Sequence, residues 1–209
     1  MSPMPVGDTE RRIEQLAAAD GLRFERNVVP AITQRGHLDL RDVAPETVSL
    51  LRGIYLDLGG NEDELAAKRP TPLRGDFLHV ATRTVVEIDE LQHFTTARRR
   101  TLVAYPPQLS LGFDLNEYLQ LCDEWSSRAD RQYAHRPAVG FGPGGRQRQR
   151  AYNDALRDIA LPALGYAPVV RIATPDRDGE TAYARVRAEL LSRTTTRTPL
   201  HPEEQNDER

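Results

Sequence analysis

Two short strands joined by a tight turn constrain the fold of this chain more than any other feature. Residues 75–79 and 84–89 both have strand composition, and the Val-Val-Glu-Ile run in the second is typical of a strand buried on both faces. The turn at residues 81–83 allows the two strands to pair as a hairpin. Because a strand buried on both faces needs helices to cover it, the pair predicts an α/β domain.

The remaining elements are predicted from the spacing of apolar residues and from turn residues. Helical spacing predicts five helices, over residues 9–19, 45–58, 115–128, 147–164 and 181–192. Asp114 is a candidate N-cap for the third of these helices, and Gly165 a candidate stop for the fourth. Strands predicted over 22–29 and 168–172 complete a mixed β-sheet of about four strands flanked by helices.

The length of 209 residues is enough for one hydrophobic core. We therefore predict a single domain over residues 1–192. Residues 31–72 show no clean strand pattern and are expected to form a helical insertion. Residues 193–209 are rich in Thr, Pro and Glu with almost no apolar content, so we predict a disordered C-terminal tail.

The sequence also predicts where the chain resides. No apolar run approaches the roughly 20 residues that span a bilayer, and the N-terminal segment lacks the layout of a signal peptide. We therefore expect a cytoplasmic protein that does not enter a membrane. The single cysteine, Cys122, excludes an intrachain disulfide framework and a multi-cysteine zinc site, and its helical position predicts a buried packing residue.

The charge balance restricts how the chain can bind nucleic acid. A net charge of −3 argues against a generally basic surface, because affinity for phosphates comes from concentrated positive charge. Local clusters must therefore provide any phosphate contacts. The candidates are Arg98, Arg99, Arg100, Arg146, Arg148 and Arg150. The alternative for both clusters is ordinary solvated charge. Residues 140–145 fit G-x-G-x-x-G, but no strand precedes them, so we expect a mobile loop and no bound dinucleotide.

Three carboxylates occur where a buried hairpin should be apolar. Glu87 and Asp89 are two residues apart on one strand and project to the same face, where Asp76 on the neighbouring strand can meet them. Carboxylates that share a partly desolvated site repel one another, so their clustering predicts a bound cation. Oxygen ligands favour Mg²⁺ or Mn²⁺, which can polarise a phosphoryl oxygen and activate water. This is the chemistry of phosphodiester hydrolysis.

The run from Asp76 through Glu87-Ile88-Asp89 to His93 resembles a known family pattern. Small PD-(D/E)XK proteins related to very-short-patch-repair endonucleases, the DUF559 group in particular, carry Asp…Glu-x-Asp-x-x-x-His. The segment from Tyr152 to Ile172 resembles the closing helix and strand of that group. The resemblance implies a restriction-endonuclease-like fold and an endonuclease that cleaves nucleic acid, DNA rather than RNA, in defence or repair.

Carried onto this sequence, the resemblance makes Asp76 and Glu87 metal ligands, with the carbonyl of Ile88 as a third. Asp89 stands where the family motif has a lysine, so the resemblance leaves open which group activates water. His93 is the candidate for proton transfer, because the ordinary pKa of histidine is near neutrality. The expected cofactor is Mg²⁺ or Mn²⁺.

We therefore predict a metal-dependent endodeoxyribonuclease, and two alternatives stay open. One is a catalytically inactive module that keeps the nuclease fold and binds nucleic acid or a protein partner. The other is an unrelated acid-rich α/β enzyme that acts on a small phosphorylated molecule. In a purely structural interpretation, Glu87 and Asp89 end a strand at an exposed edge and His93 caps the following helix.

Overall fold

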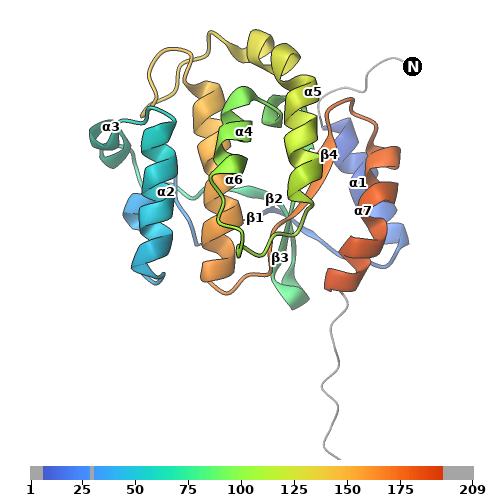
Figure 1. Cartoon of the computed structure of the whole chain (residues 1–209). Coiled ribbons are helices and arrows are strands. Elements are labelled where there is room, and N and C mark those ends of the chain that lie inside the picture. The colour runs from blue at the N-terminus through green and yellow to red at the C-terminus, as the bar shows by residue number, and fades with distance from the viewer. Residues whose placement is uncertain (1–6, 29–30, 195–209) are drawn as a thin grey trace, which may run out of the picture.

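A four-stranded sheet lies at the centre of the fold, with helices on both of its faces (Figure 1). The structure is a computed structural model that describes residues 7–28 and 31–194. Its strands are β1 (Glu25–Val28), β2 (Gly75–His79), β3 (Thr84–Glu90) and β4 (Val170–Thr174), in the order β1-β2-β3-β4. The β1–β2 and β2–β3 pairs are antiparallel and the β3–β4 pair is parallel, which confirms the predicted mixed sheet.

The described helices form a layer on each face of the sheet. On one face, α1 (Asp8–Ala19) packs against α7 (Gly179–Thr194). On the other face lie α4 (Thr96–Val103), α5 (Leu115–Tyr133) and α6 (Arg146–Ala163). The predicted insertion contains α2 (Pro45–Asp57) and the short α3 (Glu62–Ala66), and α2 packs on the outer side of α6 (Figure 1).

Alternation along β3 separates an apolar face from a charged face. Val86 and Ile88 belong to the hydrophobic cluster beneath α1 and α7. Glu87 and Asp89 occupy the intervening positions and therefore project to the opposite face, beneath α6. Glu87 is only 4% exposed and Asp89 is 0% exposed, which excludes the interpretation that they end a strand at an exposed edge.

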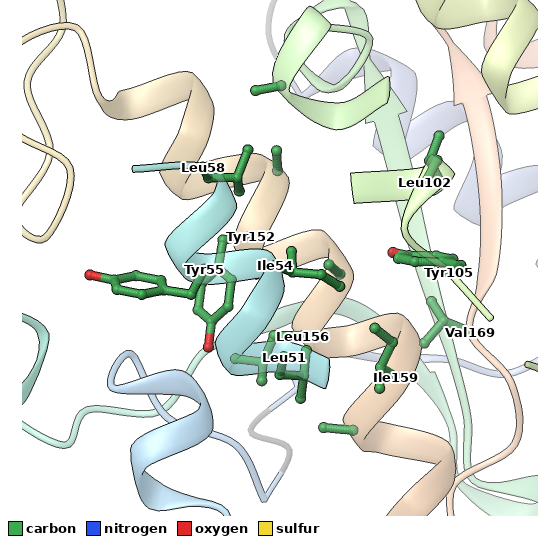
Figure 2. Close-up of a cluster of buried hydrophobic side chains, with 14 of the residues drawn as sticks. Leu51, Ile54, Tyr55, Leu58, Leu102, Tyr105, Tyr152, Leu156, Ile159 and Val169 are labelled. Carbon is green, nitrogen blue, oxygen red and sulfur yellow. The ribbon is translucent and has the colours of Figure 1, made fainter. Parts of the chain in front are cut away.

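Apolar packing between α2 and α6 fixes the position of α6 over the sheet. Figure 2 shows Leu51 and Ile54 of α2 beside Tyr152 and Leu156 of α6, all of them buried. The Tyr152 hydroxyl also lies 2.7 Å from Nδ1 of His37, which ties the start of the insertion to the same helix. Since α6 carries many of the polar residues described below, this packing positions them.

Several predicted elements are confirmed with shifted ends. The side chain of Asp114 caps α5 by accepting a 2.9 Å hydrogen bond from the N–H of Glu117, and the helix runs on to Tyr133. The predicted strand at 22–29 begins only at Glu25. The strand predicted at 168–172 occupies Val170–Thr174, because residues 168 and 169 precede its pairing with β3.

Other features differ from the predictions or lie outside the described residues. Helix α4 was not predicted, because its sequence holds three arginines and few apolar residues at helical spacing. Arg193 and Thr194, predicted as the start of a disordered tail, end α7, and the rest of that tail lies outside the described residues. Cys122 is fully buried, as predicted. No described helix combines the length and the apolar character needed to cross a membrane.

Candidate active site

A cavity of about 500 Å³ lies between the acidic strands and one face of α6. The residues that α6 contributes recur at helical spacing: Arg146, Arg150, Asn153, Asp154 and Arg157. Strands β2 and β3 contribute Asp76, Glu87 and Ile88. The insertion also lines the cavity, through Gln34 and Pro72. The cavity therefore has an acidic end on the sheet and a cationic end at the start of α6.

Asp76 and Glu87 come from neighbouring strands, as predicted. Phe77 lies opposite Val86 in the β2–β3 pairing, and continuing this register by one residue places Asp76 opposite Glu87. Oε1 of Glu87 accepts a 3.3 Å hydrogen bond from the backbone N–H of Asp76. Oδ2 of Asp76 accepts a 2.8 Å hydrogen bond from the N–H of Ile88. The two carboxylates are thus held side by side at the acidic end of the cavity.

Both carboxylates are costly to ionise where they lie. Burial raises the pKa of Glu87 to about 8, although nearby Arg157 opposes the shift. Burial also raises the pKa of Asp76, against the lowering effect of the hydrogen bond from Ile88. Nε of Arg157 lies 3.3 Å from Oε1 of Glu87 and balances part of this charge. A further cation would stabilise the ionised pair.

The donor set fits a Mg²⁺ or Mn²⁺ ion held by few protein ligands. Within the part of the chain that the structure describes, no group of three or more His, Cys, Asp or Glu side chains is arranged to hold a metal ion. Mg²⁺, however, is commonly bound through one or two carboxylates, with water and phosphate oxygens as its other ligands. Asp76, Glu87 and the carbonyl of Ile88 are the groups that would hold it.

Gly75 is the residue that makes room for Glu87. A Cβ atom at this position would lie 2.8 Å from Oε1 of Glu87 and 3.4 Å from Cγ1 of Val85. The first separation is shorter than any normal contact, so a larger residue would force the Glu87 carboxylate to move. Glycine is therefore part of the local geometry that sets the acidic end.

Two further carboxylates line the acidic end, and the sequence did not single them out. They are Glu10 of α1 and Glu90 at the end of β3. Burial, reinforced by repulsion from Asp76, raises the pKa of Glu10. Oε2 of Glu90 lies 3.7 Å from Nη2 of Arg177. No local pattern connects Glu10 to the hairpin, because only the packing of α1 on the sheet brings it there.

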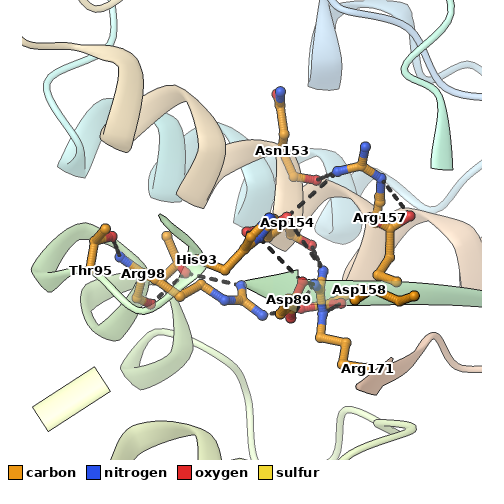
Figure 3. Close-up of polar contacts among 12 residues, drawn as sticks. Asp89, His93, Thr95, Arg98, Asn153, Asp154, Arg157, Asp158 and Arg171 are labelled. Carbon is orange, nitrogen blue, oxygen red and sulfur yellow. Dashed lines mark hydrogen bonds and ion pairs between the residues drawn. The ribbon is translucent and has the colours of Figure 1, made fainter. Parts of the chain in front are cut away.

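His93 lines the cavity and is oriented by two buried carboxylates (Figure 3). Its Nδ1 lies 2.9 Å from Oδ2 of Asp154 and 3.2 Å from Oδ1 of Asp89. Burial alone would lower the pKa of His93, but Asp154 and Asp89 outweigh it and raise the pKa above its usual value. Because both carboxylates face Nδ1, Nε2 is left to exchange a proton with a molecule in the cavity.

Asp89 corrects the prediction that three carboxylates share one site. It does not line the cavity, because both of its oxygens bind Nη1 of Arg171, at 3.0 and 2.9 Å. The hydroxyl of Tyr118 donates a further hydrogen bond to it at 3.2 Å. Asp89 lies behind the cavity and acts on it only through His93. The positively charged side chain beside Glu87 is that of Arg157, which is 9% exposed and lines the cavity.

The arginine predictions divide between surface, core and cavity. Arg98 is wrong as a phosphate contact, because it is 1% exposed and its Nη2 donates to Oδ2 of Asp158 at 2.7 Å. Arg99 pairs with Asp123 at the surface and does not line the cavity.

Arg100 pairs with Asp57 at 3.0 Å and also lies outside the cavity. Arg148, also predicted as a phosphate contact, does not line the cavity, and its guanidinium donates to the carbonyls of Leu58 and Phe141. Arg146 and Arg150 do line the cavity.

The buried network behind His93 is the largest feature that sequence reasoning missed. Arg171 is 1% exposed and joins Asp89 to Asp158, whose Oδ1 lies 2.8 Å from Nε of Arg171 (Figure 3). Nη2 of Arg171 also donates to the backbone carbonyl of Asp154 at 3.2 Å. The network therefore links β4 to β3, which precedes His93, and to α6, which carries Asp154.

No protein-family model matches this chain, and neither a curated protein nor a solved structure does. The cavity and its side chains are therefore the basis for the proposed function.

Proposed function

We propose that this protein is a Mg²⁺- or Mn²⁺-dependent nuclease of the PD-(D/E)XK, restriction-endonuclease-like class that hydrolyses phosphodiester bonds in DNA. The observation that carries the proposal is the pairing of two desolvated carboxylates, Asp76 and Glu87, in a cavity that also holds arginines. The carboxylates suit a divalent cation and the arginines suit a phosphate. We include the cytoplasmic location predicted from the sequence in this proposal.

Each polar group at the acidic end has a role in the proposed hydrolysis. Asp76 and Glu87 would hold a divalent cation, which would supply Lewis-acid stabilisation of a phosphoryl group. Arg157, beside Glu87, places a fixed positive charge where negative charge develops on the phosphate oxygens. A water molecule adds to phosphorus, the bond to the leaving oxygen breaks, and His93 donates a proton to that oxygen. Solvent takes up the proton released by the water and restores His93.

His93 suits the role of proton donor for a structural reason. Asp154 and Asp89 raise its pKa and so favour the protonated form, which holds the proton that the leaving oxygen needs. Asp154 also fixes the ring through Nδ1, so that the proton on Nε2 is the one available in the cavity. This arrangement gives Asp154 a positioning role that the family pattern alone does not assign.

The experiment that tests the proposal is a cleavage assay on single- and double-stranded DNA and RNA with Mg²⁺ or Mn²⁺. Glu87→Gln keeps the size of the side chain and removes its charge, and we expect it to lower the rate at least about 10²-fold. The matched control is Glu124→Gln, which changes an exposed glutamate on α5 outside the cavity. It should cleave at the wild-type rate.

The outcomes separate the candidate functions. Metal-dependent cleavage that Glu87→Gln abolishes supports the nuclease. Binding of oligonucleotides without cleavage under any metal would instead support an inactive module that keeps the fold. Hydrolysis of small phosphate esters, but of no polymer, would support an enzyme for a small phosphorylated substrate.

A further inference from the structure

The cationic end of the cavity contains a pair of like charges that the proposed chemistry does not use. Lys68, the only lysine in the chain, lies in the insertion just after α3, and Arg146 is the first residue of α6. Nζ of Lys68 donates a 3.2 Å hydrogen bond to the backbone carbonyl of Gln34. Gln34 and Arg146 both line the cavity. Lys68 comes from the insertion and does not itself line the cavity, but its ammonium binds the backbone of a residue that does.

No carboxylate balances this pair in the described part of the chain. Neither Lys68 nor Arg146 forms an ion pair with an acidic residue there, although Arg146 donates a hydrogen bond to the side-chain oxygen of Gln149. Most of the other arginines around α6 pair with a carboxylate or bind backbone carbonyls. Burial, reinforced by repulsion from Arg146, lowers the pKa of Lys68. Helix α6 begins beside them with no acidic residue in its first turn. An anion between the two side chains would relieve their repulsion.

The spacing along α6 relates this pair to the acidic end. Arg146 and Arg157 stand on the same face of the helix, eleven residues apart, which is about 16 Å at 1.5 Å per residue. Successive phosphates in one strand of a helix rise about 3.4 Å along the axis. Because the backbone also winds around that axis, this rise is the least distance that one nucleotide covers, so a strand with its reacting phosphate beside Arg157 and Glu87 would bring a phosphate to Lys68 and Arg146 within about five nucleotides.

We propose that Lys68 and Arg146 form a second phosphate-binding site for the same nucleic-acid strand, and that the insertion exists in the fold to supply one side of it. The site rests on the proposed function and defines its substrate as a strand long enough to reach both ends of the cavity. Arg150, between the two ends on the same helix face, lies along the path of that strand. No Phe, Tyr or Trp side chain of the described residues lines the cavity, so the strand is held by its backbone rather than by stacked bases.

The test measures binding separately from cleavage. Fluorescently labelled oligothymidylates, from about two to about twelve nucleotides, are titrated in EDTA and followed by anisotropy over a range of salt concentrations. We expect wild-type affinity to rise steeply by the time the strand reaches about five nucleotides. The double variant Lys68→Ala/Arg146→Ala should lose this rise, and its plot of log affinity against log salt should be less steep by about two. In each single variant this slope should be less steep by about one.

The control is Arg99→Ala, which removes an exposed arginine that pairs with Asp123 outside the cavity. It should keep both the length dependence and the salt slope of the wild type. Because neither Lys68 nor Arg146 is buried in the core, thermal unfolding should show all variants folded. A folded double variant with the wild-type slope and length dependence would overturn the proposal, as would a wild type that binds no oligonucleotide of any length.

This experiment distinguishes the second site from the proposed function. If the wild type cleaves DNA but its binding does not depend on Lys68 and Arg146, the second site is wrong and the nuclease stands. If the wild type binds long strands through these residues but cleaves nothing with any metal, the second site stands and the nuclease is wrong.

Discussion

Nε of Arg157 lies 3.3 Å from Oε1 of Glu87, so a helix cation and a strand carboxylate meet at the floor of the cavity. Arg157 also reaches the backbone carbonyls of Arg74 and Asn153, which fix its guanidinium between α6 and the segment before β2. In the proposed PD-(D/E)XK assignment, Asp89 stands at the lysine position, and it binds Arg171 instead of lining the cavity. Arg157 therefore supplies the positive charge from a different element.

Replacing Arg157 with glutamine should change metal binding and turnover in opposite directions. Loss of a positive charge beside Glu87 should strengthen Mn²⁺ binding about three- to tenfold, because like charges in the site no longer repel. Turnover should fall about 10²-fold, because the phosphate loses a preorganised cation. Calorimetric Mn²⁺ titration and single-turnover cleavage measure the two effects. Unchanged turnover of Arg157→Gln would show that Arg157 does not take part in the reaction.

How far the site could be predicted depends on how local its contacts are. The hairpin and the positions of Asp76 and Glu87 follow from strand alternation, which acts over two residues. The same alternation predicts the face of the sheet on which Asp89 lies, but it does not predict that Asp89 pairs with Arg171. Arg171 reaches it from β4, the parallel neighbour of β3, after a connection that includes three helices. Neighbours of this kind are set by tertiary packing and leave no spacing in the sequence.

Arginine clusters illustrate the same limit. Arg98 and Arg99 are adjacent in sequence, yet the first is buried against Asp158 of α6 and the second is exposed on α4. A helix turns about 100° per residue, so neighbouring positions face different environments. Since α4 was not predicted, the sequence could not distinguish them. Asp154 was also missed, because its contact with His93 joins residues on separate elements.

Asp154→Asn should slow cleavage about 10²- to 10⁴-fold while leaving Mn²⁺ binding unchanged. The carboxylate of Asp154 holds Nδ1 of His93 at 2.9 Å and helps to raise the pKa of its imidazole. Without that charge the pKa of His93 falls, and a proton donor with a lower pKa loses its proton at lower pH. The alkaline limb of the pH–rate profile should therefore move to lower pH.

A matched control for this variant is Asp123→Asn, which changes an exposed aspartate on α5. Its pH–rate profile should coincide with that of the wild type. If Asp154→Asn lowers the rate without moving the alkaline limb, Asp154 serves the fold and does not tune His93.

Stability without metal should fall as pH rises, because of Glu87. Burial raises its pKa from 4.5 to about 8 in the folded protein, so between these values the folded state binds a proton that the unfolded state has lost. The stabilising contribution is complete below about pH 4.5 and is lost as pH rises through about 8. Each tenfold change in proton affinity is worth about 1.4 kcal/mol, so the loss should reach a few kcal/mol.

The measurement is urea unfolding in EDTA at acidic, neutral and alkaline pH, with Glu87→Gln beside the wild type. Glutamine cannot ionise, so the difference in unfolding free energy between the two proteins should favour Glu87→Gln increasingly as pH rises. Comparing the two proteins cancels the contributions of the other titrating groups. A difference that stays constant across the range would show that Glu87 is ionised in the folded protein throughout.

Gly75→Ala should weaken metal binding at least about tenfold, because the new Cβ atom would lie 2.8 Å from Oε1 of Glu87 and push that carboxylate aside. Gly53→Ala is the matched control. Gly53 lies within α2 and has no atom within 4 Å of its would-be Cβ, so this substitution should leave the site alone and stabilise the helix by about 0.5–1 kcal/mol. Calorimetric Mn²⁺ titration compares the two variants, and urea unfolding verifies that both are folded. Equal Mn²⁺ affinity for wild type and Gly75→Ala would contradict the prediction. It would mean that the position of the Glu87 carboxylate next to Gly75 is not needed to hold the metal.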